Sequence, residues 1–296
     1  MQPPSPTRVC LALLLTPTAY AVSYGLGVLA SVVILRDGYG AGTSASTMAD
    51  GPLLLSECVL IGLGLLLAGC AAGALGRSAL REWAVGRRPR RPGAGALAAG
   101  LVTVANLVGF WLFAWINPPE PPQDPATHAL WYDLIRPMVS GALGEELIVL
   151  ALPVIVIRRT APRFLQRPRS LVLVLGALVL MRLAYHLYQG VWAGSHLPWA
   201  VAAVLLYRWT GRVWPQIAAH AFWDTGVALR DHEVLTHAQE MCLFSVFGAA
   251  TVMIGAGVCL HDRRRRQTRQ CSLRGGEQLG AEHVAFPEPE RTALDP

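Results

Sequence analysis

The sequence contains no lysine and few charged residues of any kind. All 25 basic residues are arginine, and charged residues make up only 15% of the 296 positions. A soluble domain carries about 25% charged residues, whereas 53% of the residues here are hydrophobic. This scarcity of charge excludes an ordinary soluble protein and favours one that crosses a membrane several times. We attribute the missing lysine to genomic composition bias rather than to chemistry.

The chain also lacks the cysteine spacing of a metal or disulfide framework. Its six cysteines form no CxxC pair and no Cys/His pattern typical of zinc sites. The formal charge of +6 arises from arginines clustered between apolar runs. This distribution predicts contact with anionic lipid headgroups of the bilayer, and no nucleic-acid partner.

Long apolar runs predict an all-α, polytopic membrane helix bundle of about eight transmembrane helices, since one crossing needs about 20 residues. We expect a transmembrane domain over residues 1–262 and a basic, disordered cytoplasmic tail over 263–296. The first apolar run continues past a signal-like Ala-Tyr-Ala site, so we interpret it as an uncleaved span. The expected spans are residues 9–35, 52–75, 95–116, 130–157, 170–190, 191–207, 213–229 and 241–260.

Arginine-rich connections alternate with neutral or acidic ones along the chain. The basic segments are 76–94, 158–169, 208–212 and the tail from 261. The positive-inside rule therefore predicts a multi-pass protein of the cell membrane with both termini cytoplasmic. The proline-rich stretch 117–129 predicts an extended loop that cannot be helical.

Ionisable residues inside the apolar runs carry the functional signal, because a charged side chain at bilayer depth costs roughly 2.5–3.5 kcal/mol. Residues four apart share one helix face, so three helices can each aim two polar groups at one internal point. We predict a buried site built from three pairs: Glu145 and Glu146, Arg182 and His186, and His220 and Asp224.

This constellation resembles the CPBP family of intramembrane proteases, which includes the type II CAAX prenyl endopeptidases and the bacteriocin-processing Abi proteins. The family pattern has EExxxR, then FxxxH, then HxxxN or HxxxD on successive helices. Here Glu145 and Glu146 match the paired glutamates, His186 matches the second motif, and His220 with Asp224 matches the third. The resemblance implies an intramembrane endopeptidase that uses these five residues on a peptide or membrane-protein substrate.

Two positions depart from the family pattern within the similar core, about residues 130–230. The arginine expected four residues after the second glutamate is Leu150, and the phenylalanine expected four before His186 is Arg182. We hypothesise that the cation has moved, so that Arg182 neutralises Glu146 in place of the missing arginine.

Peptide hydrolysis needs a base for water, a proton donor for the leaving amine and positive character at the oxyanion. We expect Glu145 to be the base, with a proton shared between the adjacent carboxylates, and His186 and His220 to stabilise the oxyanion and transfer protons. An ionised Asp224 cannot donate as an asparagine would, so it either orients His220 or ligates a metal. Glu145, His186, His220 and Asp224 also form a ligand set for a divalent ion such as zinc, which leaves a metalloprotease mechanism open beside a metal-free one.

Two other functions compete with this interpretation. The chain could be a non-catalytic relative that binds a membrane or peptide partner, or a proton-coupled carrier that uses the buried carboxylates as a relay. Helix-breaking Gly/Pro pairs in symmetry-related halves would favour the carrier, and the sequence shows none.

Each polar position also has a structural interpretation. The two glutamates could form a salt bridge with Arg182 or Arg136, and His186 could be a packed interhelical residue. Tryptophans near the span ends are expected to be interfacial anchors: Trp131, Trp199, Trp209 and Trp214. The remaining histidines are expected to lie in solvated loops or in the tail: His128, His196, His232, His237, His261 and His283.

Overall fold

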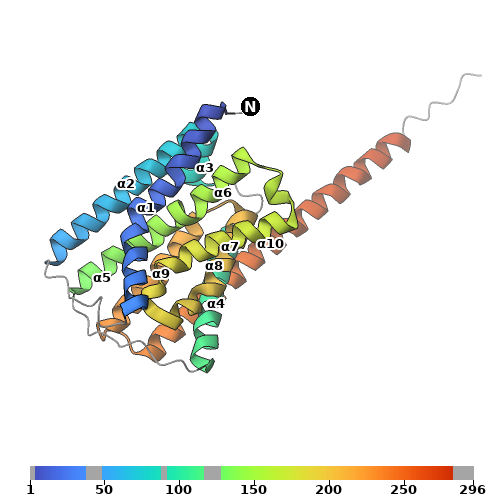
Figure 1. Cartoon of the computed structure of the whole chain (residues 1–296). Helices are drawn as coiled ribbons and strands as arrows, with labels where there is room; N and C mark the ends of the chain where they lie inside the picture. Colours follow the sequence, from blue (N-terminus) through green and yellow to red (C-terminus); the bar gives the residue numbers. More distant parts are fainter. Residues whose placement is uncertain (1–3, 38–48, 88–91, 117–127, 283–296) are drawn as a thin grey trace, which may run out of the picture.

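The computed structural model describes residues 4–37, 49–87, 92–116 and 128–282, and these residues form helices and turns without a β-strand. The fold class is therefore all-α, as predicted (Figure 1). In chain order the helices are α1 (Pro6–Asp37), α2 (Asp50–Ala74), α3 (Arg77–Val85), α4 (Ala94–Ile116), α5 (Leu130–Arg136), η1 (Pro137–Ala151), α6 (Leu152–Thr160), η2 (Phe164–Gln166), α7 (Pro168–Ala184), η3 (Leu187–His196), α8 (Leu197–Thr210), α9 (Trp214–Asp231) and α10 (His237–Glu282).

Eight helical segments correspond to the eight predicted spans, but two of them are short or polar. Within the described ranges, six segments are long and apolar enough to cross a membrane: Pro6–Val33, Asp50–Ala74, Ala94–Ile116, Leu130–Thr160, Leu187–Thr210 and His237–Thr268. The other two are α7, which has only 17 residues, and α9, which carries His220 and Asp224 within 18 residues. The predicted count of eight is therefore approximate, and the polytopic membrane architecture is confirmed.

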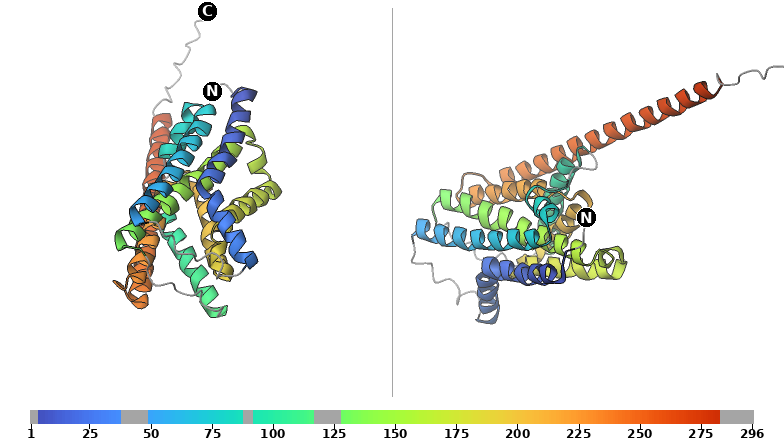
Figure 2. Two further views of the ribbon diagram at one scale, coloured as in Figure 1. Left: turned by 60° about the vertical axis from the view of Figure 1, so that its left-hand side comes forward. Right: turned by 90° about the horizontal axis from the view of Figure 1, so that it is seen from above.

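The continuous segment α5–η1–α6 is the centre of the bundle. In its most apolar window 78% of the residues are buried, against 17% in α1, α2 and α10. Residues of η1 and α6 belong to two apolar cores, one shared with α1 and α2 and the other with α7, α8 and α9. Figure 2 shows these helices from two further directions. Polar side chains on η1 are thus shielded from lipid by neighbouring helices on both sides.

Three basic connections gather at one end of the bundle. The Arg158 guanidinium binds the Glu82 carboxylate of α3, Arg208 Nη2 donates to the Leu165 carbonyl at 3.2 Å, and the Arg87 amide donates to the Gly211 carbonyl at 2.8 Å. The segments expected on one side of the membrane therefore meet there. That this side is cytoplasmic stays a prediction.

Two expectations about connecting segments were wrong. The arginine-rich stretch 76–94 contains helix α3, because Ala79 and Glu82 turn inward on one face while basic residues face outward. The tail expected to be disordered from residue 263 continues α10 as a helix to Glu282 (Figures 1 and 2). Arginine is a good helix former, and Arg266 Nε donates to Asp262 Oδ2 four residues earlier at 2.8 Å. The proline-rich loop lies outside the described residues from 117 to 127, as do positions 283–296 of the tail.

Candidate active site

The paired glutamates lie on η1, a segment whose backbone hydrogen bonds join residues five apart instead of four. The Leu152 amide, for example, donates to the Leu147 carbonyl. Such wide turns are found mostly as short bulges and frequently at functional sites. Glu145 is 4% exposed and Glu146 is fully buried, so both carboxylates lie inside the protein and must be balanced there.

Arg182, near the end of α7, is the fixed cation of the site. Its Nη2 binds Glu146 Oε1, and its Nε lies 3.6 Å from Glu145 Oε2. The face of the Trp199 ring covers the guanidinium, with Cζ 3.8 Å from the ring centre. This desolvated cation–π contact further stabilises the buried charge of Arg182. The ion pair between Arg182 and Glu146 is the contact that the sequence hypothesis predicted.

Arg136, the other candidate counter-ion, and Leu150, which replaces the motif arginine, do not contact the paired glutamates through a charge. Arg136 Nε donates to both oxygens of Glu57, at 3.0 and 2.8 Å, so it is committed away from the paired glutamates. Leu150, which stands where the family has arginine, is 1% exposed and packs in the apolar core between η1, α7 and α8. The missing arginine has thus been replaced by an apolar contact, and its charge comes from a neighbouring helix.

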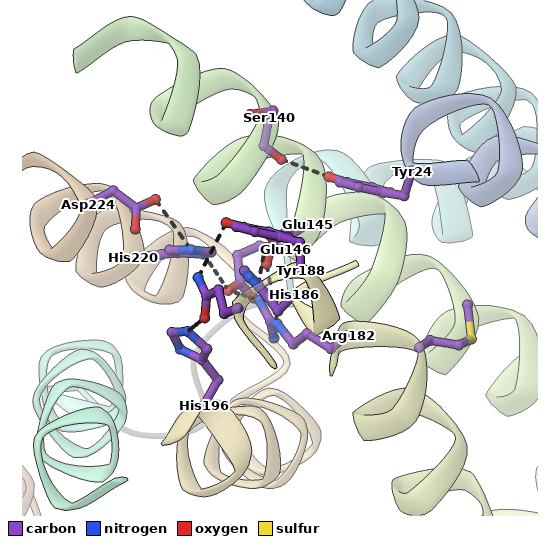
Figure 3. Close-up of polar contacts among 12 residues, drawn as sticks. Tyr24, Ser140, Glu145, Glu146, Arg182, His186, Tyr188, His196, His220 and Asp224 are labelled. Carbon is purple, nitrogen blue, oxygen red and sulfur yellow. Dashed lines mark hydrogen bonds and ion pairs between the residues drawn. The ribbon is translucent and has the colours of Figure 1, made fainter. Parts of the chain in front are cut away.

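His220 and Asp224 extend the site onto α9. His220 Nδ1 lies 3.2 Å from Glu146 Oε1, and Nε2 lies 3.4 Å from Asp224 Oδ2. Both ring nitrogens of His220 therefore face carboxylates. The geometry favours the first of the two expected roles for Asp224, which is to orient His220 (Figure 3).

His186 follows the last turn of α7 and approaches the other glutamate. Its Nε2 lies 3.7 Å from Glu145 Oε1, and neither ring nitrogen has a hydrogen-bond partner in the protein. The structure therefore brings together all five residues predicted for the site, with Arg182 beside the two glutamates (Figure 3). Their catalytic roles stay predictions.

Five further polar atoms of this site also have no hydrogen-bond partner in the protein. They are Glu145 Oε2, Glu146 Oε2, the Tyr185 hydroxyl, and Nε and Nη1 of Arg182. Buried polar groups are nearly always hydrogen-bonded, and exceptions require an explanation such as a bound water or a catalytic role. Unpaired donors and acceptors on both sides of Glu145 are suited to hold a water molecule and a polar substrate group.

Two residues of the site were missed by the sequence reasoning. Trp199, expected to be an interfacial anchor, is 3% exposed and packs edge-on against His220 with ring centres 4.7 Å apart. His196, expected to be solvated, lies with its ring 4.8 Å from that of His186 and bonds Gln189 Oε1 at 2.9 Å. Both lie on or after η3, where Gly190 has φ +61° and turns the chain back toward α7.

Helix α1 supplies a third group that no motif indicated. The Tyr24 hydroxyl donates to the Ser140 carbonyl of η1 at 2.7 Å, and its ring stacks on Tyr185 at 4.7 Å. Tyrosines in an apolar first span gave no signal, because their partners are more than a hundred positions away in the chain.

Gly141 brings the backbone of η1 close to α9. A Cβ atom at this position would lie 2.8 Å from Asp224 Oδ2 and 3.6 Å from His220 Nε2. Any side chain here would push on the carboxylate that orients His220, so the close approach depends on glycine.

The predicted metal donors do not fit a metal site. Within the described ranges, no three His, Cys, Asp or Glu residues are placed so that they could hold one ion. Of the four predicted donors, His220 has both nitrogens directed at carboxylates. The metalloprotease alternative therefore gains no support, and we derive no step through a metal.

Comparison with known proteins agrees with the motifs. Residues 127–226 match the family model described as Rce1-like, type II CAAX prenyl endopeptidase. No curated protein and no solved structure matches the chain. The match covers about a third of the sequence and contains every residue of the three motifs, so the family resemblance drawn from them is confirmed. It also extends protease activity to this chain as a family-level expectation.

Proposed function

We propose that this protein is an intramembrane endopeptidase of the CAAX type, in which Glu145 activates the water that attacks the scissile carbonyl. The observation that carries this proposal is the unequal pairing of the two glutamates. One oxygen of Glu146 is held by both Arg182 and His220, whereas Glu145 makes only longer contacts, at 3.6 Å to Arg182 and 3.7 Å to His186. The carboxylate that is free to accept a proton is the better base.

The reaction proceeds by proton transfers that this arrangement supports. Glu145 takes a proton from water while the water oxygen bonds to the carbonyl carbon. The oxyanion forms where the unpartnered ring N–H of His186 can donate to it, near the fixed charge of Arg182. The proton then passes to the amide nitrogen, the carbon–nitrogen bond breaks, and the new amine leaves.

Glu146 and Asp224 have supporting roles in this mechanism. Glu146 fixes Arg182 and one side of His220, and Asp224 fixes the other side. The Glu146–His220–Asp224 arrangement keeps the imidazole in one orientation and costs little reorganisation during the reaction.

The test uses the protein in nanodiscs and a farnesylated CAAX peptide, with release of the last three residues followed by mass spectrometry. We expect Glu145→Gln to lower kcat by about 10³-fold while the protein stays folded. Glu57→Gln changes a carboxylate outside the site and serves as the matched control. Unchanged cleavage by E145Q would show that Glu145 is not the base.

The non-catalytic alternative makes a different prediction for the same variant. If the protein only binds a peptide, the wild-type protein should leave the farnesylated peptide intact. The E145Q variant should then bind this peptide as tightly as the wild type does. The relocated cation argues against this alternative, because Arg182 restores the neutralisation that loss of the motif arginine would remove.

A further inference from the structure

Helix α3 contacts the backbone of η1 directly beside the paired glutamates. The indole Nε1 of Trp83 donates to the Leu147 carbonyl at 3.0 Å. Leu147 is the residue that follows Glu146. Trp83 lies outside the family-matched stretch, and the arginine-rich region around it was expected to be only a loop.

The Leu147 carbonyl accepts two hydrogen bonds at once. One comes from Trp83 and the other from the Leu152 amide, five residues further along the chain. In a regular α-helix this carbonyl would accept from residue 151 instead. A lateral donor draws the carbonyl away from the helix axis and so favours the wider turn.

The wider turn matters because it fixes how the carboxylates point. Tightening η1 by one backbone hydrogen bond would rotate Glu145 and Glu146 relative to α7 and α9. Arg182 and His220 approach Glu146 from these two helices. A small rotation would therefore break contacts on both sides, and a misplacement of about 1 Å can cost 10²-fold in rate.

Trp83 itself is held firmly enough to act as a lateral support. The neighbouring Glu82 carboxylate binds Arg158 and Arg159 of α6, which ties α3 to the segment that continues η1. On the α2 side the indole lies against Gly69, where an added Cβ would make van der Waals contact with Trp83 Cζ3 at 3.4 Å. The indole thus lies between α2 and η1, and it packs on both apolar cores.

We propose that Trp83 is a positioning residue, which holds the wide turn of η1 and thereby the orientation of the paired glutamates. This inference rests on the proposed function for its catalytic consequence, but not for its structural one. It adds α3, at the basic end of the bundle, to the elements on which the site depends.

The test compares two tryptophans that donate the same kind of bond. Trp83→Phe removes the indole N–H that reaches Leu147. Trp214→Phe is the matched control for loosening of α3 itself, since Trp214 Nε1 donates at 2.9 Å to the carbonyl of Ala84, the residue next to Trp83. Hydrogen–deuterium exchange in nanodiscs is measured on peptides covering 140–155, and kcat and KM are measured with the farnesylated peptide.

We expect W83F to accelerate exchange at residues 147–152 and to lower kcat about 10-fold, with KM changed less than twofold. W214F should leave both measurements at wild-type values. Equal behaviour of the two variants would overturn the proposal, and so would faster exchange in W83F with unchanged kcat.

If the wild-type protein leaves the peptide intact, the proposed function fails, while the role of Trp83 is still decided by a second measurement. Unfolding midpoints are then compared for W83F, E146Q and the double variant. A non-additive double variant supports coupling between the indole and the glutamate pair. Additive midpoints, or unchanged exchange in W83F, contradict it.

Discussion

Among the buried carboxylates that contact arginine, Glu82 and Glu146 have surroundings that differ in charge balance. Glu82, at the basic end, is 6% exposed and contacts three guanidinium groups, those of Arg87, Arg158 and Arg159. Glu146, in the centre, is fully buried and shares a single arginine with Glu145. The acid surrounded by cations is fully paired with arginine, whereas the two acids that share one arginine each keep an oxygen without a hydrogen-bond partner.

The arginines around Glu82 are also more exposed to solvent than Arg182, which binds Glu146. The three arginines around Glu82 have side chains 21–48% exposed, so water screens them. The Arg182 side chain is 2% exposed. Removing one partner should therefore be far more costly in the centre than at the basic end, and three changes can test that contrast.

The largest expected effect follows from removing the central cation. Arg182→Met keeps an unbranched apolar stem but removes the guanidinium that neutralises Glu146, and breaking such a buried pair costs about 3–5 kcal/mol. We expect a strongly lowered unfolding midpoint in detergent. The double variant R182M/E146Q should recover part of that loss, and a wild-type midpoint for R182M alone would contradict the buried ion pair.

A smaller effect is expected where η1 approaches α9. Gly141→Ala adds a Cβ 2.8 Å from Asp224 Oδ2, which must shift the carboxylate and with it His220. We expect kcat on the farnesylated peptide to fall about 10-fold, with little change in unfolding midpoint. Gly176→Ala on α7, where the new Cβ meets nothing within 4 Å, is the control. Equal kcat for the two variants would show that Asp224 does not need this orientation.

The smallest effect should come from the structural acid. Glu82→Gln removes one charge from a network whose arginines reach solvent, so we expect a loss of about 1 kcal/mol in unfolding free energy. Raising the salt concentration should shrink the difference between wild type and E82Q. A loss as large as that of R182M would remove the distinction between the two carboxylate sites.

Much of the architecture followed from the sequence because hydropathy reports how each segment meets lipid. The paired Glu145 and Glu146 in an apolar run required a partner, and Arg182 in a neighbouring span and Arg136 were the candidates. The unmatched acids, together with the missing motif arginine, thus predicted the contact between Arg182 and Glu146, 36 positions apart. The three motifs then defined the other residues of the site.

The remaining site residues depend on contacts that no local pattern encodes. His196 and Trp199 lie near Pro198 and Gly194, an interrupted run typical of a loop. The positive φ of Gly190 is a conformation that glycine adopts readily, and it returns this run to α7. Trp83 gave no signal because six arginines surround it in the sequence, although its indole N–H donates to the Leu147 carbonyl of η1.

The position of the cation on α7, and not on η1, has a consequence for biogenesis. A segment with EExxxR brings its own counter-charge into the membrane, whereas η1 enters with two glutamates and Leu150. Alone in the bilayer it would bear a penalty of roughly 2.5–3.5 kcal/mol for each ionised acid. Arg182 is synthesised 36 residues after Glu146, so its charge is absent when η1 first reaches the membrane. We therefore expect η1 and α7 to enter the lipid as a pair, with η1 held in the insertion machinery until α7 emerges.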